Sequence, residues 1–312
     1  MTDSPSRSEP SSDLVLTDGT TWNIVPKDIR AAQFVLHLQK IMCLGQHLHP
    51  GRKLVIRTEN NDTIGIPALD EVSAANTAAP SGLMDERVTH VGHGLRFYDD
   101  HEGTVICSLR PEITEDLLTA QLTQVAMVLA TAPLKRGGVL LHGALAERNN
   151  CGIILAGPGG AGKTTACRRI SPHWRTLCDD TTLVVRDKHG AYWGHPWPTW
   201  SRFLFGGTGG SWDVRHAVPL KAIFFLCRAE TERFELVGKG QAVTLLVELA
   251  EQVLFPILKG MDTQNMRSLR MLVFDNICTL VKSVTGYLLY LGKSGSFCSE
   301  LEKILDISEN KN

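Results

Sequence analysis

Residues 157–164 have the sequence Gly157-Pro158-Gly159-Gly160-Ala161-Gly162-Lys163-Thr164, which matches the pattern G-x-x-x-x-G-K-[ST] at every position. The apolar run at residues 152–156 predicts a buried strand before the motif, and residues 165–170 can continue as a helix after it. A strand, a glycine-rich turn and the start of a helix are the context in which this pattern binds phosphate. The segment therefore predicts an α/β fold with a phosphate-binding loop.

The chemistry of the motif gives each part of the loop a role. Glycines let backbone N–H groups turn inward around a phosphate chain, and the helix start adds free N–H groups and a positive dipole end. Lys163 is expected to reach the β- and γ-phosphates of ATP, and the Thr164 hydroxyl to ligate Mg²⁺. The alternative is a glycine-rich turn that precedes Lys-Thr by chance. The predicted nucleotide-binding residues are Gly157, Pro158, Gly159, Gly160, Ala161, Gly162, Lys163, Thr164 and Thr165.

Composition narrows the class of protein. The 312 residues include 43% hydrophobic and 21% charged residues, which is ordinary for a globular protein with a sizeable core. A formal net charge of −1 gives no basic footprint for nucleic acid. The eight cysteines form no C-x-x-C pair, so neither a zinc knuckle nor a dithiol redox site is predicted. We find no signal peptide and no apolar run that spans a bilayer, and we therefore expect a cytoplasmic protein without a membrane partner.

Three segments are predicted along the chain. Residues 1–13 are rich in Ser, Pro and Asp and are expected to form a disordered tail. Residues 14–93 are expected to form a small N-terminal α+β unit, with a hairpin around the turn Asp18-Gly19, a helix over 29–44 and a loop or linker over 67–81. Residues 94–312 are expected to form the phosphate-binding domain. Its predicted elements are a strand pair over 95–109, a helix over 115–134, strands near 138–146 and 220–227, and helices over 241–258, 261–291 and 297–307.

Two adjacent aspartates are the second chemical signal. Asp179 and Asp180 follow an apolar strand, and Asp179 comes sixteen positions after Lys163 (179 − 163). Phosphoryl-transfer enzymes with this kind of loop need a carboxylate near Mg²⁺, at the end of a neighbouring strand. One aspartate can hold the metal while the other accepts a proton from an attacking hydroxyl. The alternative is a solvated turn, and adjacent strand residues reach one site only if the strand ends or twists there.

Other candidates carry weaker signals. His142 ends the apolar run Val139-Leu140-Leu141, and it either bonds a backbone carbonyl or assists the aspartate pair. Arg202 or Arg215 can supply a cation for the transferred phosphate, with surface charge as the alternative for each. Three tryptophans can stack a base, hold a peptide or pack in the core; they are Trp197, Trp200 and Trp212.

The order of these motifs resembles the HPr kinase/phosphorylase family, which is related to phosphoenolpyruvate carboxykinases. The resemblance rests on His142-Gly143, the loop, and Cys178-Asp179-Asp180. It implies a mixed β-sheet core with flanking helices and ATP-dependent phosphorylation of a serine hydroxyl. It also implies catalytic roles by position: Lys163 on the phosphates, Thr164 and Asp179 around Mg²⁺, Asp180 as base, and His142 in support of Asp180.

Two departures from that family change the expected substrate. The loop ends Lys163-Thr164-Thr165 where HPr kinases have Lys-Ser-Glu, and the downstream Glu-Ile-Arg-Gly-Leu-Gly stretch is missing. The Pro196-Trp197-Pro198 segment is more similar to HPr kinase-like proteins of ribosomal-peptide modification cassettes, such as ScmC-type proteins and lasso-peptide serine kinases. This implies a peptide or small-protein acceptor, with a PqqD-like peptide binder and radical SAM enzymes as cassette partners. Whether the chain forms a homo-oligomer is left open.

The sequence favours a kinase that transfers the γ-phosphate of ATP to a Ser or Thr hydroxyl, and two alternatives stay open. A nucleotide-binding scaffold would present a peptide to partner enzymes without turnover. A small-molecule kinase or carboxykinase-like enzyme would need a compact polar pocket, which the aromatic segment at 196–212 does not suggest.

Overall fold

Two β-sheets organise the chain. The structure, a computed structural model, describes residues 11–46, 49–58, 87–92, 95–99, 104–109, 114–170, 172–204, 209–258, 263–292 and 295–306. The strands are β1 (Ser12–Val15), β2 (Thr21–Pro26), β3 (Arg52–Thr58), β4 (Arg87–Gly92), β5 (Leu95–Asp99), β6 (Val105–Leu109), β7 (Val139–Arg148), β8 (Cys151–Ala156), β9 (Arg175–Cys178), β10 (Thr181–Arg186), β11 (Tyr192–Trp197), β12 (Val218–Arg228), β13 (Arg233–Leu236) and β14 (Thr285–Leu291). The helices are α1 (Ile29–Met42), α2 (Glu115–Leu134), α3 (Lys163–Arg169), α4 (Ser201–Leu204), α5 (Lys239–Leu258), α6 (Thr263–Ser283) and α7 (Cys298–Ile304).

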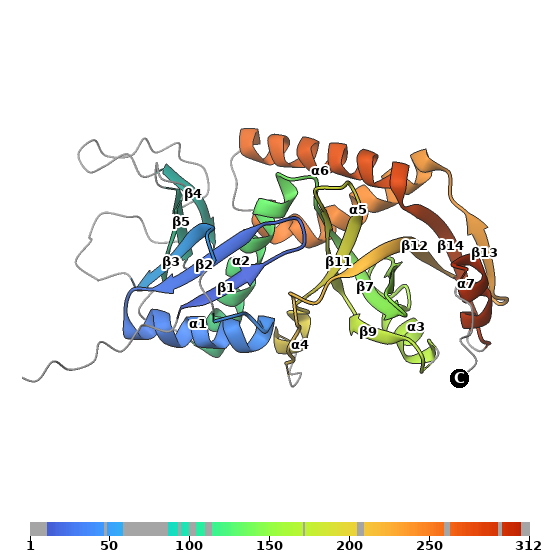
Figure 1. The fold of residues 1–312 in the computed structure, drawn as a ribbon, viewed down its shortest axis with the longest axis horizontal. Coiled ribbons are helices and arrows are strands. Elements are labelled where there is room, and N and C mark those ends of the chain that lie inside the picture. Colours follow the sequence, from blue (N-terminus) through green and yellow to red (C-terminus); the bar gives the residue numbers. More distant parts are fainter. Residues whose placement is uncertain are drawn as a thin grey trace, which may run out of the picture.

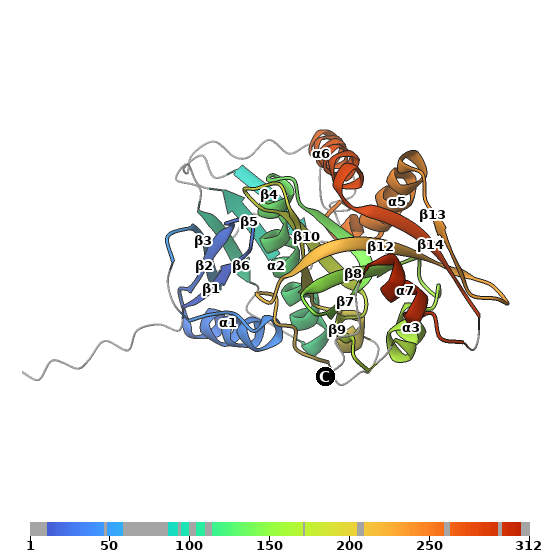
Figure 2. The same ribbon diagram turned by 45° about the vertical axis from the view of Figure 1, so that its right-hand side comes forward.

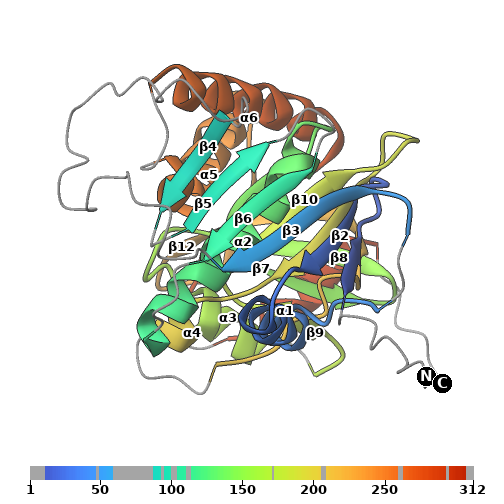
Figure 3. The same cartoon turned by 90° about the vertical axis from the view of Figure 1, so that its left-hand side faces the viewer.

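The first sheet is a six-stranded unit near the N-terminus, with the order β1-β2-β3-β6-β5-β4 (Figure 3). The predicted hairpin forms as the antiparallel pair β1–β2, and β3 then pairs in parallel with both β2 and β6. α1 packs on β2 and β3 because its apolar side chains recur at three- and four-residue steps along one face. Asp28 caps α1 by accepting from the backbone N–H groups of Arg30 and Ala31, and it also accepts from Thr58 in β3.

The second sheet contains the glycine motif. Its order is β11-β10-β7-β8-β12-β14-β13, with β9 beside β7. β8 lies at the centre between antiparallel β7 and parallel β12, and all six of its residues are buried. A further pairing between β11 and β12 bends this sheet back on itself. α5 and α6 lie along one side of the sheet, and α3 and α7 lie near each other on another (Figures 1 and 2).

One continuous core joins the two sheets. Buried residues from Leu14 in β1 to Val284 after α6 belong to the same apolar cluster. α2 contributes many of them, and the indole N–H of Trp22 in β2 donates to the Leu129 carbonyl of α2 at 3.1 Å. A second cluster packs α3 and α7 against β8 and β12. The predicted fold class, a mixed α/β protein with a small N-terminal unit, is confirmed.

Several predicted boundaries differ from the structure. The strand pair expected in the second domain consists of β5 and β6, which hydrogen-bond into the N-terminal sheet through β3. A division at 93/94 therefore separates strands of a single sheet. Ser12 and Asp13, expected in the tail, lie in β1 and are buried, because they pair with β2. Residues 1–10 of the expected tail and the predicted linker at 67–81 lie outside the described residues.

The predicted helix over 261–291 is wrong in its last quarter, residues 284–291. α6 ends at Ser283, and β14 follows at once as a strand between β12 and β13. The sequence of β14, Thr-Gly-Tyr-Leu-Leu-Tyr-Leu, is apolar enough to suit either structure. The two neighbouring strands that accept and donate its hydrogen bonds decide between them. β13 was not predicted from the sequence.

α2 is, within the described part of the chain, the one helix long and apolar enough to cross a membrane by length and composition alone. The prediction that no apolar run could span a bilayer did not identify this helix. In its most apolar stretch 61% of the helix is buried inside the protein, and buried core helices of other proteins meet the same criteria of length and composition.

Candidate functional site

The glycine loop, defined here as residues 157–164, connects β8 to α3. Gly160 and Gly162 have φ angles of 77° and 104°, in the left-handed region that favours glycine. Gly157 is required for a different reason, because a Cβ there would lie 2.8 Å from Cβ of Ala161. A Cβ on Gly159 would meet no heavy atom within 4 Å, so that part of the loop is open. The local geometry thus explains why glycine recurs in the motif.

Lys163 lies inside the loop and is buried, although it is charged. Its Nζ donates to the Gly157 carbonyl at 2.8 Å and to the Pro158 carbonyl at 3.3 Å. Burial lowers the pKa of Lys163, and the Asp180 and Asp179 carboxylates partly offset that effect. The threonines that follow, Thr164 and Thr165, are exposed in the first turn of α3. Lys163 and Thr164 are therefore placed together at the end of β8.

Strand register brings His142 and Asp180 to this loop. β7 runs antiparallel to β8 with Gly143 opposite Ala156, so His142 is level with the first residue of the loop. On the other side of β7, β9 and β10 both pair with it, and a bend at residues 179–180 separates them. His142 lies opposite Thr181, the residue after this bend. His142 lies within β7, which continues to Arg148, close to the strand predicted near 138–146.

His142 bridges two side chains from distant parts of the sequence. Its Nε2 lies 2.8 Å from Oδ1 of Asp180, and its Nδ1 lies 2.7 Å from Oε1 of Gln252 in α5. Burial alone would raise the pKa of Asp180. The hydrogen bond and charge of His142, with the charges of Lys163 and Arg202, outweigh burial, so the pKa lies below its ordinary value. Asp180 is therefore a carboxylate at neutral pH, held beside an imidazole.

Asp179 points to different partners. Its Oδ1 accepts from the Thr199 hydroxyl at 3.1 Å, and its Oδ2 accepts from Nη2 of Arg202 at 2.6 Å. The bend between β9 and β10 thus sends the two carboxylates to different neighbours, Asp180 to His142 and Asp179 to Arg202. The two aspartates that sequence analysis grouped are brought to the same region but have separate hydrogen-bond networks.

The arginine and tryptophan candidates separate in the structure. Arg202 is an ion-pair partner of Asp179, with its guanidinium 5.9 Å from the ring centroid of Trp212. Arg215 pairs instead with Asp213 at 3.6 Å. The three tryptophans singled out in the sequence are all buried in the main apolar cluster, so core packing accounts for them: Trp197, Trp200 and Trp212.

Sequence reasoning missed two residues of the site. Gln252 contacts His142, and Arg228 donates from Nη2 to the Gly160 carbonyl of the glycine loop. Arg228 ends the apolar strand β12, which is parallel to β8, and a charge at that position was a usable signal. Gln252 carried no signal, because an exposed glutamine in a long helix is ordinary.

The donor set fits Mg²⁺ bound together with phosphate oxygens. No cluster of three or more His, Cys, Asp or Glu suited to a metal ion occurs among the described residues. Thr164 and Asp179 offer a hydroxyl and a carboxylate, the hard oxygen ligands that Mg²⁺ prefers alongside substrate phosphates. Asp179 must exchange its ion pair with Arg202 for a metal ion to take that carboxylate.

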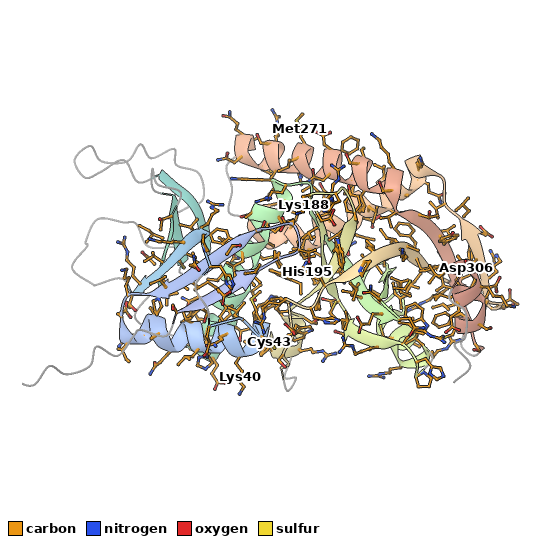
Figure 4. The ribbon with its side chains drawn as sticks, viewed as in Figure 1. Lys40, Cys43, Lys188, His195, Met271 and Asp306 are labelled. Atoms are coloured by element: carbon orange, nitrogen blue, oxygen red, sulfur yellow. The ribbon has the colours of Figure 1, made fainter. Side chains whose placement is uncertain are left out.

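An apolar hollow lies apart from these residues, between α5 and α6. Its volume is about 430 Å³, and its lining includes Leu254, Leu258 and Leu269, with Glu251 and Arg270 paired at 3.0 Å. Phe255 on α5 and Met271 and Phe274 on α6 are exposed apolar side chains on the same helix pair. Figure 4 shows Met271 on the outer side of α6.

The fold and site define a mixed α/β protein in which a strand–glycine loop–helix segment lies beside a histidine–aspartate pair. Residues 105–306 match the family described as SynChlorMet cassette protein ScmC, and the chain belongs to this family. The matched region begins at β6 and ends just after α7, so it includes every residue of the site described above. No curated protein matches the sequence.

Proposed function

We propose that this ScmC-family protein is an ATP- and Mg²⁺-dependent kinase of the HPr kinase-like type. It phosphorylates a Ser or Thr hydroxyl on a peptide or small protein of its SynChlorMet cassette, in the cytoplasm. The observation that carries the proposal is the position of Asp180, hydrogen-bonded to His142 and within the electrostatic influence of Lys163 in the glycine loop. A carboxylate beside a phosphate-binding lysine is the arrangement that phosphoryl transfer to a hydroxyl requires.

Each residue of the site has a task in this reaction. Bound ATP and Mg²⁺ supply the phosphoryl group and the neutralising charge. Lys163 Nζ exchanges the Gly157 and Pro158 carbonyls for phosphate oxygens. As the acceptor oxygen bonds to the γ-phosphorus, the bond from that phosphorus to the β,γ-bridging oxygen breaks and ADP leaves with the electron pair. Asp180 takes the acceptor proton, and His142 holds that carboxylate in place.

The test is phosphorylation of the precursor peptide of the cassette. Purified protein is incubated with peptide, Mg²⁺ and γ-labelled ATP, and the peptide mass is measured. We expect a gain of one phosphate, reduced roughly 10²- to 10⁴-fold by Asp180→Asn because the general base is lost. Asp116→Asn is the control, because it makes the same change on an exposed turn of α2. ATP binding without transfer to any cassette peptide would contradict the kinase proposal.

The apolar hollow supports a second role that the same experiment separates from the first. Exposed Phe255, Met271 and Phe274 beside a hollow are typical of a surface that binds another protein. In that role the chain would bind nucleotide and bring cassette proteins together, such as a PqqD-like peptide binder or a radical SAM enzyme. If the protein is a scaffold, Asp180→Asn should still bind the partner, and neither the wild type nor the variant should transfer phosphate.

A further inference from the structure

Arg228 approaches the glycine loop from the side opposite the histidine–aspartate pair. β8, which leads into the loop, lies between β7 and β12 in the sheet. His142 of β7 is level with the start of the loop on one side. On the other side Phe225 lies opposite Ala156, so the last three residues of β12 continue past the paired end of β8, alongside the loop.

Contacts with the loop and with β14 fix the position of Arg228. A Cβ on Gly157 would lie 3.6 Å from Cβ of Leu226, which shows how closely β12 borders the loop. Just after Arg228, the backbone N–H of Ala229 donates to the Leu291 carbonyl of β14 at 3.0 Å. The guanidinium then donates from Nη2 to the Gly160 carbonyl. The charge is therefore presented at the middle of the loop by the end of β12, which is paired with β14 on its other side.

The charge of Arg228 is available, unlike that of Arg202. Its side chain is exposed, and it has no ion pair with a carboxylate in the part of the chain that the structure describes. A guanidinium has five N–H donors in a fixed fork, and one contact to Gly160 leaves most of them for a ligand. Such a fork matches the paired oxygens of a phosphate group.

We infer that Arg228 binds the non-transferred phosphates of the nucleotide, a diphosphate unit held in the glycine loop. The inference rests on the proposed function, because it needs a nucleotide in that loop. It follows from the opposite placement of Arg228 and Asp180 about β8. The acceptor hydroxyl meets the γ-phosphate on the Asp180 side, so a cation on the opposite side faces the diphosphate that leaves. The affinities for ADP and for ATP therefore depend on Arg228 to a similar extent.

The experiment measures binding of ATP, ADP and inorganic pyrophosphate to the full-length protein by calorimetry, with no peptide present. We expect Arg228→Gln to weaken the binding of each of the three ligands roughly tenfold or more, because the variant lacks a charge-assisted contact that all three ligands make. Arg228→Lys keeps the charge without the fork and should retain part of the affinity. Lys221→Gln is the matched control. It removes the same charge from the exposed far end of β12 and should leave binding unchanged.

Three outcomes would overturn the inference. Equal affinities in wild type and Arg228→Gln would show that Arg228 does not contact the ligand. A loss confined to ATP would place Arg228 on the γ-phosphate instead. Wild-type protein that binds none of the three ligands would refute nucleotide binding itself, and with it the proposed function. Normal binding in wild type with no effect of Arg228→Gln would leave that function standing.

Discussion

At the scale of single residues, the environment of His142 defines the acid–base chemistry of the site. Asp180 is ionised at neutral pH, so the His142 Nε2–H donates to it. The Gln252 carboxamide faces Nδ1 and can bond the ring in either protonation state. Its oxygen accepts from the Nδ1–H of an imidazolium. When the amide group is rotated by half a turn, its amino group donates to the unprotonated Nδ1 of the neutral ring. Gln252 is therefore a positioning residue that keeps His142 aimed at Asp180 without fixing its charge.

Substitution of Gln252 should change the pH dependence of the site in a defined direction. Gln252→Glu places a carboxylate at Nδ1 and stabilises the protonated ring. We expect the pH–activity profile, measured as phosphate transfer to the peptide, to move upward. Gln252→Leu removes the partner and should lower activity without that upward shift.

The control for Gln252 is Gln241→Glu, which makes the same charge change on an exposed position of α5. It should leave the pH–activity profile unchanged. An equal upward shift in both variants would mean that overall charge, and not contact with His142, is responsible.

At the scale of elements, α6 shows how one buried side chain joins three segments. Asn276 Nδ2 donates to the carbonyl of Leu134, the last residue of α2, at 2.7 Å, and to that of Gly138, just before β7, at 2.8 Å. The final carbonyls of a helix have no partner within the helix, and a buried one requires a partner from elsewhere. Asn276 thereby fixes α6 against the corner from which β7 carries His142 to the glycine loop.

Replacement of Asn276 should destabilise the protein by an amount that depends on the side chain that replaces it. Asn276→Ala removes a donor from each of two buried carbonyls, and that of Leu134 keeps only the 3.3 Å bond from the Gly137 N–H. We expect a loss of about 1–3 kcal/mol in unfolding free energy. Asn276→Asp is nearly isosteric but places carboxylate oxygen against the two carbonyl oxygens, so its loss should be larger, about 3–5 kcal/mol at pH 7. Urea unfolding measures both, with Asn265→Asp on the exposed first turn of α6 as control. Equal stability of the Asp and Ala variants would contradict the assigned donors.

At the scale of the whole molecule, His195 links the two sheets. It lies in β11, fully buried, in the interior that Figure 4 shows between them. Its Nδ1–H donates to the Val214 carbonyl at 2.7 Å, and its Nε2 accepts from the backbone N–H of Thr17, in the β1–β2 turn, at 3.4 Å. The same 212–214 segment donates from the Trp212 N–H to the Ile41 carbonyl of α1 at 2.7 Å. Neutral His195 thus takes part in holding the N-terminal unit on the second sheet.

Stability should fall on mild acidification because of His195. Burial lowers its pKa from 6.5 to about 4, so below pH 6.5 the unfolded chain binds a proton that the folded protein does not. The stabilisation is complete above pH 6.5 and declines as the pH falls to 4, with a total on the order of 3 kcal/mol from this shift. Asp28 acts in a lower window, because its folded pKa lies below 3.8.

The test compares urea unfolding at pH 7 and pH 4.5. We expect the loss between the two pH values to be smaller in His195→Gln than in wild type by about 2–3 kcal/mol. His189→Gln, an exposed histidine in the turn after β10, should keep the wild-type loss. An unchanged loss in His195→Gln would mean that another group controls acid stability.

The sequence by itself determined the glycine loop, its flanking strand and helix, and most element types, because these depend on residues that are neighbours along the chain. It predicted that Asp179, Asp180 and His142 belong to one region, but not that a bend gives the two aspartates different partners. Only the folded protein decided which residues far apart in the sequence come into contact. Gln252 bonds His142, and Arg228 bonds the Gly160 carbonyl. β5 and β6 belong to the N-terminal sheet, and β14 forms a strand and not the end of a helix. The local sequence pattern is compatible with many possible contacts, and strand register and helix packing select among them. A strand in particular is stabilised by neighbouring strands that come from elsewhere in the chain.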